Sequence, residues 1–178
     1  MGIPFLYWAD CIKRIGLEME RVERIRNHPV YLEYLAAIEQ AEIGRVFCCH
    51  GLEHALDVAR IMYIIALEEN LDFPKDVIYG VALLHDIGRK RQYEENIPHN
   101  EAGIMAAECI LAECGYEKEE ILKMTEAIRS HQKQKESEPI SLNTLLYVAD
   151  KKSRACYHCK VKDMCYWEKE KRNETVVY

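Results

Sequence analysis

The sequence has few residues that interrupt regular secondary structure, with only 8 glycines and 5 prolines among its 178 residues. Long alternations of apolar and polar residues, which are typical of half-buried β-strands, are also missing. No internal repeat or low-complexity block is present, which argues against a repeat architecture. These absences argue against a strand-rich fold and favour an all-α protein. The length suits a single domain with one sizeable core.

Positive charge is outnumbered, because 24 lysines and arginines stand against 30 aspartates and glutamates, which gives a formal net charge of −6 at pH 7. Generic nucleic-acid binding depends on a basic surface that neutralises phosphates, so we do not expect it. A small phosphorylated substrate is still compatible with an acidic chain, because a bound metal ion can supply positive charge locally.

A membrane span is missing as well. The apolar start of the chain, Met1–Ala9, is too short to cross a bilayer, and no basic leader with a small-residue cleavage site is present. We therefore expect a cytoplasmic protein without a membrane partner, and nothing in the sequence predicts a particular oligomeric state. In that compartment the 8 cysteines indicate thiols or metal ligands rather than a disulfide framework.

Apolar residues recur at helical spacing through most of the chain and predict a bundle of about seven to eight helices. The predicted helices lie within residues 5–26, 29–43, 52–67, 77–86, 100–113, 121–131 and 142–150. A charged loop is expected at residues 89–96 and a polar loop at residues 132–139. We expect residues 1–44 to pack on a core formed by residues 45–155, with a basic, cysteine-containing tail at 156–178 in the same domain.

The most informative stretch is His85-Asp86-Ile87-Gly88, which ends an apolar run. Adjacent side chains diverge by about 100° on a regular helix, so this pair can converge on one ion only at a helix end. Gly88 stands where a left-handed helix stop is cheapest, which predicts such an end. The alternative is a solvated Asp86 beside a histidine satisfied within the core.

Further inward-facing polar side chains are predicted at the ends of other helices. His54 shares a stripe with Val58 and Ile61, and His131 ends a stripe that contains Met124 and Ile128. Asp150 and His99 also stand at helix ends. Any one of these histidines alone is more typical of a core residue. Burying the whole set without partners would cost several kcal/mol, so together they predict a metal site.

These elements resemble the HD-domain superfamily of metal-dependent phosphohydrolases, whose pattern is H, then HD, then D on a helical bundle. The family places a Val-Ala pair four and five residues after its metal histidine, and Val58-Ala59 therefore selects His54 rather than His50. His85-Asp86-Ile87-Gly88-Arg89 matches the second element and Ala149-Asp150 the third. The resemblance covers residues 45–154 and implies an HD-domain-like fold.

Two further histidines resemble those of two-metal members of the superfamily, namely His99, followed by Gly103, and His131. The resemblance implies one ion on His54, His85, Asp86 and Asp150, and a second on His99 and His131, with Asp86 as the bridge. A single ion is the alternative. The nitrogen and oxygen donors suit Mn, Fe, Co, Ni, Zn or Mg without selecting one. Gly115-Tyr116-Glu117 departs from the GYP tripeptide of the cyclic dinucleotide branch, which disfavours that branch.

The implied activity is hydrolysis of a phosphoester in a nucleotide or another small phosphorylated metabolite. Asp86 would orient or deprotonate the attacking water. His50 would act as general acid or contact the substrate, or it would only support a metal ligand. Candidate phosphate contacts, each of which could equally be a solvated surface residue, are Arg45, Arg89, Lys90 and Lys151. Alternatives to a phosphohydrolase are a non-catalytic nucleotide- or redox-responsive sensor and, less favoured, a di-iron oxygenase.

The tail contains Cys156-x2-Cys159-x5-Cys165, whose first two thiols can bind one ion. A structural Zn or an iron–sulfur centre is one interpretation, with a fourth ligand from His158, Cys11, Cys48 or Cys49. The other interpretation is that these cysteines are small hydrophobic residues. The superfamily resemblance does not extend to this segment.

Overall fold

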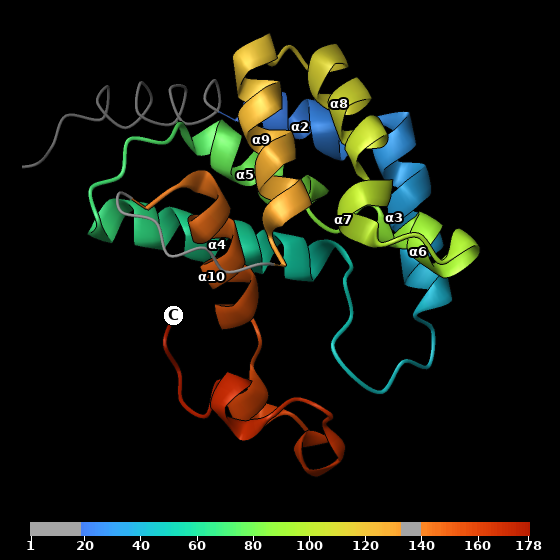
Figure 1. Ribbon diagram of the computed structural model, residues 1–178, viewed down its shortest axis with the longest axis vertical. Helices are drawn as coiled ribbons and strands as arrows, with labels where there is room; N and C mark the ends of the chain where they lie inside the picture. The colour runs from blue at the N-terminus through green and yellow to red at the C-terminus, as the bar shows by residue number, and fades with distance from the viewer. Residues whose placement is uncertain (1–18, 133–139) are drawn as a thin grey trace, which may run out of the picture.

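The computed structural model describes residues 19–132 and 140–178. These residues form helices and turns without a β-strand, which confirms the predicted all-α fold class (Figure 1). In chain order the α-helices are α2 (Glu20–Arg26), α3 (Pro29–Ala41), α4 (Leu52–Glu68), α5 (Lys75–Leu84), α6 (Arg89–Glu95), α7 (His99–Ala102), α8 (Ile104–Glu113), α9 (Lys118–Ser130) and α10 (Leu142–Lys152). Three short 3-10 turns follow: η1 (Cys156–His158), η2 (Lys162–Met164) and η3 (Lys169–Lys171).

Helix α4 is the centre of the core and packs against both α5 and α10 (Figure 1). Its side chains Val58, Ala59 and Met62 are fully buried, as the apolar periodicity of the sequence predicts. Burying a side chain such as Met62 stabilises the fold by roughly 1.5–3 kcal/mol. Helices α2 and α9 also contact α5, and α10 contacts α9. The ends of α4, α5, α9 and α10 carry the inward-facing polar residues.

Residues 89–96, expected as a charged loop, form helix α6 instead. Pairs four residues apart stabilise this short helix, with Lys90 Nζ 3.3 Å from a Glu94 carboxylate oxygen and Arg91 Nη2 2.7 Å from Glu95. Asn96, at φ 59°, ends it in the left-handed conformation. The prediction was wrong because charge density was taken as a sign of a loop.

The predicted stop at Gly88 was also wrong in its geometry, because Gly88 has φ −67° and begins α6 in the right-handed region. A glycine is needed here for another reason. A Cβ atom at Gly88 would lie 2.0 Å from the carbonyl oxygen of His99 and 2.5 Å from the amide nitrogen of Gly103. The close approach of these backbones places His99 beside Asp86, and Gly103 divides the predicted helix 100–113 into α7 and α8.

Three sequence-based predictions fall on residues outside the described ranges: the start of the first helix at residues 5–18, most of the polar loop at 132–139, and Cys11 as a possible ligand beside the tail cysteines. None of the helices in the described ranges has the length and hydrophobicity that crossing a membrane requires.

We predict that Gly88→Ala destabilises the protein by about 2 kcal/mol or more, because the added methyl group meets backbone atoms that cannot rotate away. Urea unfolding followed by circular dichroism measures this change. Gly51→Ala is the matched control, since its Cβ would meet only the flexible end of Glu39 at 3.1 Å. Equal stability of the two variants would contradict the close-approach explanation.

Candidate metal centre

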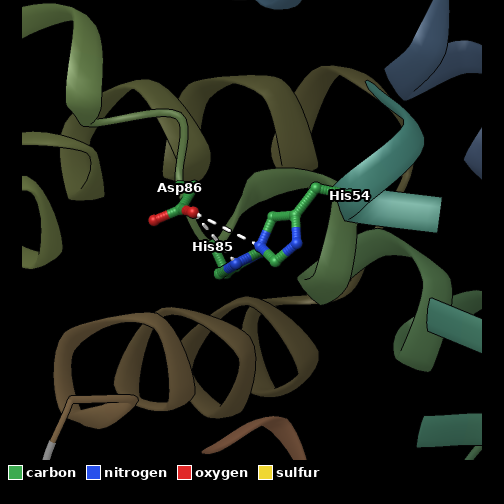
Figure 2. A group of neighbouring side chains, drawn as sticks. All are labelled: His54, His85 and Asp86. Atoms are coloured by element: carbon green, nitrogen blue, oxygen red, sulfur yellow. Dashed lines mark ion pairs between the residues drawn. The ribbon is translucent and has the colours of Figure 1, made fainter. Parts of the chain in front are cut away.

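The buried carboxylate of Asp86 lies at the centre of the site, in the turn that follows α5. Its Oδ2 atom is 3.6 Å from His54 Nε2 and 3.3 Å from His85 Nε2. Its Oδ1 atom is 3.2 Å from His99 Nε2 and 4.0 Å from His131 Nε2. Figure 2 shows His54 and His85 converging on this carboxylate. Each oxygen of Asp86 therefore faces a different pair of histidines.

The four histidine rings share one orientation, with Nε2 toward Asp86 and Nδ1 toward an outer partner. The Nδ1 partners are Ala82 O for His85 (2.7 Å), Ile128 O for His131 (2.5 Å), Gln92 Oε1 for His99 (2.9 Å) and Ser153 Oγ for His54 (3.4 Å). A carbonyl oxygen can only accept, so Nδ1 carries the proton wherever a carbonyl is the partner. Such partners fix the tautomer and direct the lone pair of Nε2 to the centre.

Asp150, near the end of α10, adds a second buried carboxylate to the His54 side of the site. Its Oδ1 atom is 3.5 Å from His54 Nε2. Its Oδ2 atom is ion-paired with Lys151 and lies 3.7 Å from Arg154 Nη2. His54, His85, Asp86 and Asp150 thus gather on one side of the centre.

The charges of these groups suit a cation. Burial alone would raise the pKa of Asp86, but His85 and Arg89, whose Nε is 2.9 Å from Oδ1, hold that pKa well below its ordinary value. Burial is likewise outweighed at Asp150, where His54, His85 and Lys151 lower the pKa. Burial lowers the pKa of His99 to about 3 and that of His131 to about 4. Anionic carboxylates therefore face neutral rings at His99 and His131 at pH 7. At His85 the lowering of the pKa by burial is outweighed by Asp86 and Asp150, which raise it.

Unsatisfied polar atoms show that the donor set fits a metal ion. Within the described ranges, the buried atoms His54 Nε2, His85 Nε2 and Asp86 Oδ1 form no hydrogen bond, and Asp86 Oδ1 has only its ion pairs, such as that with Arg89 at 2.9 Å. Each such group costs about 1–3 kcal/mol when left unpaired. Two sets of three ligand atoms lie within 4.8 Å of one another, His54 with His85 and Asp86, and Asp86 with His99 and His131. A nitrogen and oxygen set of this kind is compatible with divalent metal ions.

His50 lies beside this centre but not on α4, because Gly51 is the residue that caps the helix. Its ring is 5.6 Å from the ring of His54, measured between centroids. Its Nδ1 lies 2.5 Å from Glu42 Oε1, and its backbone N–H donates to Glu42 Oε2 at 2.7 Å. Burial lowers the pKa of His50 to about 4, against the opposing effects of Asp86 and Glu42, so the ring is neutral at pH 7.

Glu42 is a site residue that the sequence analysis missed. It is buried, it holds His50, and it also accepts a hydrogen bond from Tyr93 Oη at 2.5 Å. In the sequence Glu42 looks like any other charged residue at the end of a surface helix, because both partners come from separate segments. Only the contact between α3 and α6 could have identified it.

The four expected phosphate contacts occupy different places. Arg89 and Lys151 line a cavity of about 710 Å³ that also borders His99, His131 and Asp150. Lys90 instead pairs with Glu33 and Glu94, and Arg45 donates from Nε to the carbonyl oxygen of Cys48. Neither of these two lines the cavity. Further cavity residues that were not predicted from the sequence are Lys152, Arg154, Trp167, Lys171 and Arg172.

The tail cysteines Cys156, Cys159 and Cys165 do not contribute to either set of metal-site ligands. They line a separate cavity.

Comparisons with known proteins bear on the family and the fold of this chain. The model of the HD domain family matches residues 51–155. The chain is 42% identical over 160 residues to an uncharacterized protein of Clostridium beijerinckii (strain ATCC 51743 / NCIMB 8052), covering 90% of this chain and 100% of that protein. It is also similar to the crystal structure of a predicted HD superfamily hydrolase from an uncultured Thermotogales bacterium, with a TM-score of 0.56, 24% identity and 79% of each chain covered. That last similarity concerns the fold.

We predict that the two sides of the centre lose metal separately. His99→Ala combined with His131→Ala should remove one divalent ion per chain and leave the ion on the His54 side, whereas Asp86→Ala should remove both, because Asp86 serves both sides. Elemental analysis after reconstitution with Mn²⁺ and dialysis measures the content. His28→Asn is the matched control, because His28 caps α3 through Val30 N at 3.2 Å and an asparagine keeps the cap. Full metal content in the Asp86 variant would contradict the bridging role.

Proposed function

Because this chain belongs to the HD domain family, we propose that it is a metal-dependent phosphohydrolase acting on a nucleotide or another small phosphorylated metabolite. The observation that carries the proposal is the position of Asp86, whose two oxygens face two histidine pairs beside a cavity rich in basic side chains. Metal ligands and anion-binding groups are thus adjacent, which is the combination that phosphoester hydrolysis requires.

The proposed metal ligands are His54, His85, Asp86 and Asp150 for one ion, and Asp86, His99 and His131 for a second. Bound divalent ions lower the pKa of a coordinated water and neutralise phosphate charge. The outer partners of the rings, such as Gln92 at His99 Nδ1, hold the ligand nitrogens in place. Asp86, kept anionic by His85 and Arg89, is the group that orients the attacking water.

The proposed substrate site is the cavity of about 710 Å³, a volume in the range of small-molecule sites. The basic side chains that line the cavity suit a phosphate group. Lys151 is ion-paired with the proposed ligand Asp150, and its Nζ lies 5.8 Å from the ring centroid of Trp167, so it connects Asp150 to the tail. Trp167 lines the cavity with Arg154 over its ring at 4.0 Å, so a base or another flat group of the substrate would stack on Trp167 by replacing that guanidinium. A phosphate with an aromatic or apolar substituent fits this lining.

His50 does not line the cavity of about 710 Å³. It is proposed as the proton donor to the leaving group, as a contact to the substrate, or as a support for the metal ligand His54, whose ring lies 5.6 Å away. Glu42 accepts from the Nδ1–H of His50 at 2.5 Å, which leaves Nε2 to exchange a proton. The ring is neutral at pH 7, so it would first take up a proton, and Glu42 would stabilise the resulting cation. Tyr93 and the backbone of His50 hold Glu42 in place for that role.

We predict that the Mn²⁺-reconstituted protein hydrolyses at least one member of a panel of nucleotides, dinucleoside polyphosphates, sugar phosphates and cyclic nucleotides. His85→Ala with Asp86→Ala should lower kcat/KM by about 1,000-fold or more, because both sides of the centre lose a ligand. Phosphate release measures turnover, and His28→Asn should retain it. Tight binding of a panel member with no turnover would favour the sensor, and oxygen uptake by reduced, iron-loaded protein would favour the oxygenase.

For a substrate found in that panel, we predict that Lys152→Ala with Lys171→Ala raises KM by about fivefold while kcat changes little, because these residues line the cavity away from the metal ligands. Lys160→Ala is the matched control, since it removes a tail lysine that lines neither this cavity nor the cysteine cavity. Steady-state kinetics separates the two constants. An unchanged KM would place the substrate elsewhere.

A further inference from the structure

Four cysteines from two distant parts of the chain line one cavity of about 280 Å³ outside the metal centre. Cys48 comes from the connection between α3 and α4, and Cys156, Cys159 and Cys165 come from the tail after α10. None of the four forms a disulfide. The sequence analysis left the fourth partner of the tail cysteines open among several residues, and the fold brings Cys48 to them.

The local backbone positions each of these cysteines. Cys156 begins the turn η1 and Cys159 ends it, with Cys159 N–H donating to Cys156 O at 3.2 Å. Cys165 ends the turn η2 in the same way, donating to Lys162 O at 3.2 Å. Cys48 is held by its own carbonyl oxygen, which accepts from Arg45 Nε at 2.9 Å.

The tail lacks the apolar core that would otherwise hold it in place. Among the described residues from 156 to 178, only Asn173 is buried, and no apolar side chain is. Polar contacts shape the segment instead. Arg172 donates to the carbonyl oxygens of Lys162, Cys165 and Trp167 at 3.2, 2.9 and 2.7 Å. Small segments without a hydrophobic core commonly depend on a metal or a disulfide for stability.

The distances between the four cysteine sulfur atoms indicate whether these residues suit a single zinc ion or an iron–sulfur cluster. A single Zn²⁺ binds thiolates at about 2.3 Å, which brings tetrahedral sulfur ligands to about 3.8 Å from one another. All four cysteines lie in the described part of the chain, and no three of their sulfur atoms fall within 4.8 Å of one another. A four-iron cluster is larger, because each of its four cysteines binds a different iron.

We propose that Cys48, Cys156, Cys159 and Cys165 bind an iron–sulfur cluster that fixes the tail against the core. Each thiol loses its proton on binding iron, and the cluster takes the volume between the four sulfurs. The position has a consequence for the neighbouring centre. Arg154 and Arg172 line both this cavity and the larger one beside His99 and Asp150, so the cluster would hold one wall of the proposed substrate site.

The test is the acid-labile sulfide content of the full chain, expressed with added iron and purified without oxygen. About four sulfides per chain and the broad visible absorbance of a cluster are expected. Cys48→Ser and Cys159→Ser should each lose more than nine tenths of the sulfide. Cys49→Ser is the matched control, since Cys49 is adjacent and also exposed but does not line the cavity, and it should keep the full content.

The sulfide content reports only on the cysteine site, so His85→Ala with Asp86→Ala should leave the sulfide content unchanged. The test of the cluster is therefore independent of the proposed hydrolase activity. Limited trypsin digestion gives a second readout, because the tail should be cut after Lys160 and Lys162 in Cys48→Ser but stay protected in the wild type. A wild-type protein without sulfide, one equivalent of zinc bound by the four cysteines in its place, or full sulfide in Cys48→Ser would overturn the proposal.

Discussion

The structure depends on one buried carboxylate that several helices approach at once. Asp86 is only 6% exposed, and its two oxygens are surrounded by ring nitrogens from α4, the end of α5, α7 and the end of α9. An anion in this position is costly unless cationic or hydrogen-bonding groups offset its desolvation. Arg89 supplies part of that charge, and a cation between the carboxylate and the rings would supply the rest. The same feature is therefore compatible with a divalent metal ion and indicates where such an ion would bind.

Packing, rather than ligand chemistry, makes this convergence possible. Helix α9 packs on α5 and helix α10 packs on α4, whereas α7 packs against α6, α8 and α9. The polar residues of these helices lie at or near helix ends, where side chains can turn inward. The backbone contact between Gly88 and Gly103 brings α7 close enough for His99 to face Asp86 Oδ1. A methyl group at that contact would displace a ligand without touching the metal centre, so fold stability and ligand geometry are coupled there.

The parts of the fold and of the candidate site that could be predicted from the sequence are those with a periodic pattern of apolar residues. The apolar stripes that end at His131 and run beside His54 predict both the helices and the side that each histidine faces, and the all-α fold was predicted correctly. Glu42 and Gln92 could not be found in that way, because each acts across a contact between separate segments and carries no local pattern. Helix α6 was missed because its stability comes from pairs of charges rather than from an apolar face.

The tail extends this coupling beyond the core. Asn173 Nδ2 donates to the carbonyl oxygens of Lys151 and Arg154, at 2.8 and 2.7 Å, which attaches the tail to the end of α10. Asp150, a proposed metal ligand, directly precedes Lys151 in α10. Lys171 and Arg172, which line the larger cavity, thus belong to a segment without buried apolar side chains. The group proposed to order the four cysteines would therefore also set the shape of the cavity beside the proposed metal ligands. Substrate selection would then depend on a part of the chain outside the residues that match the family.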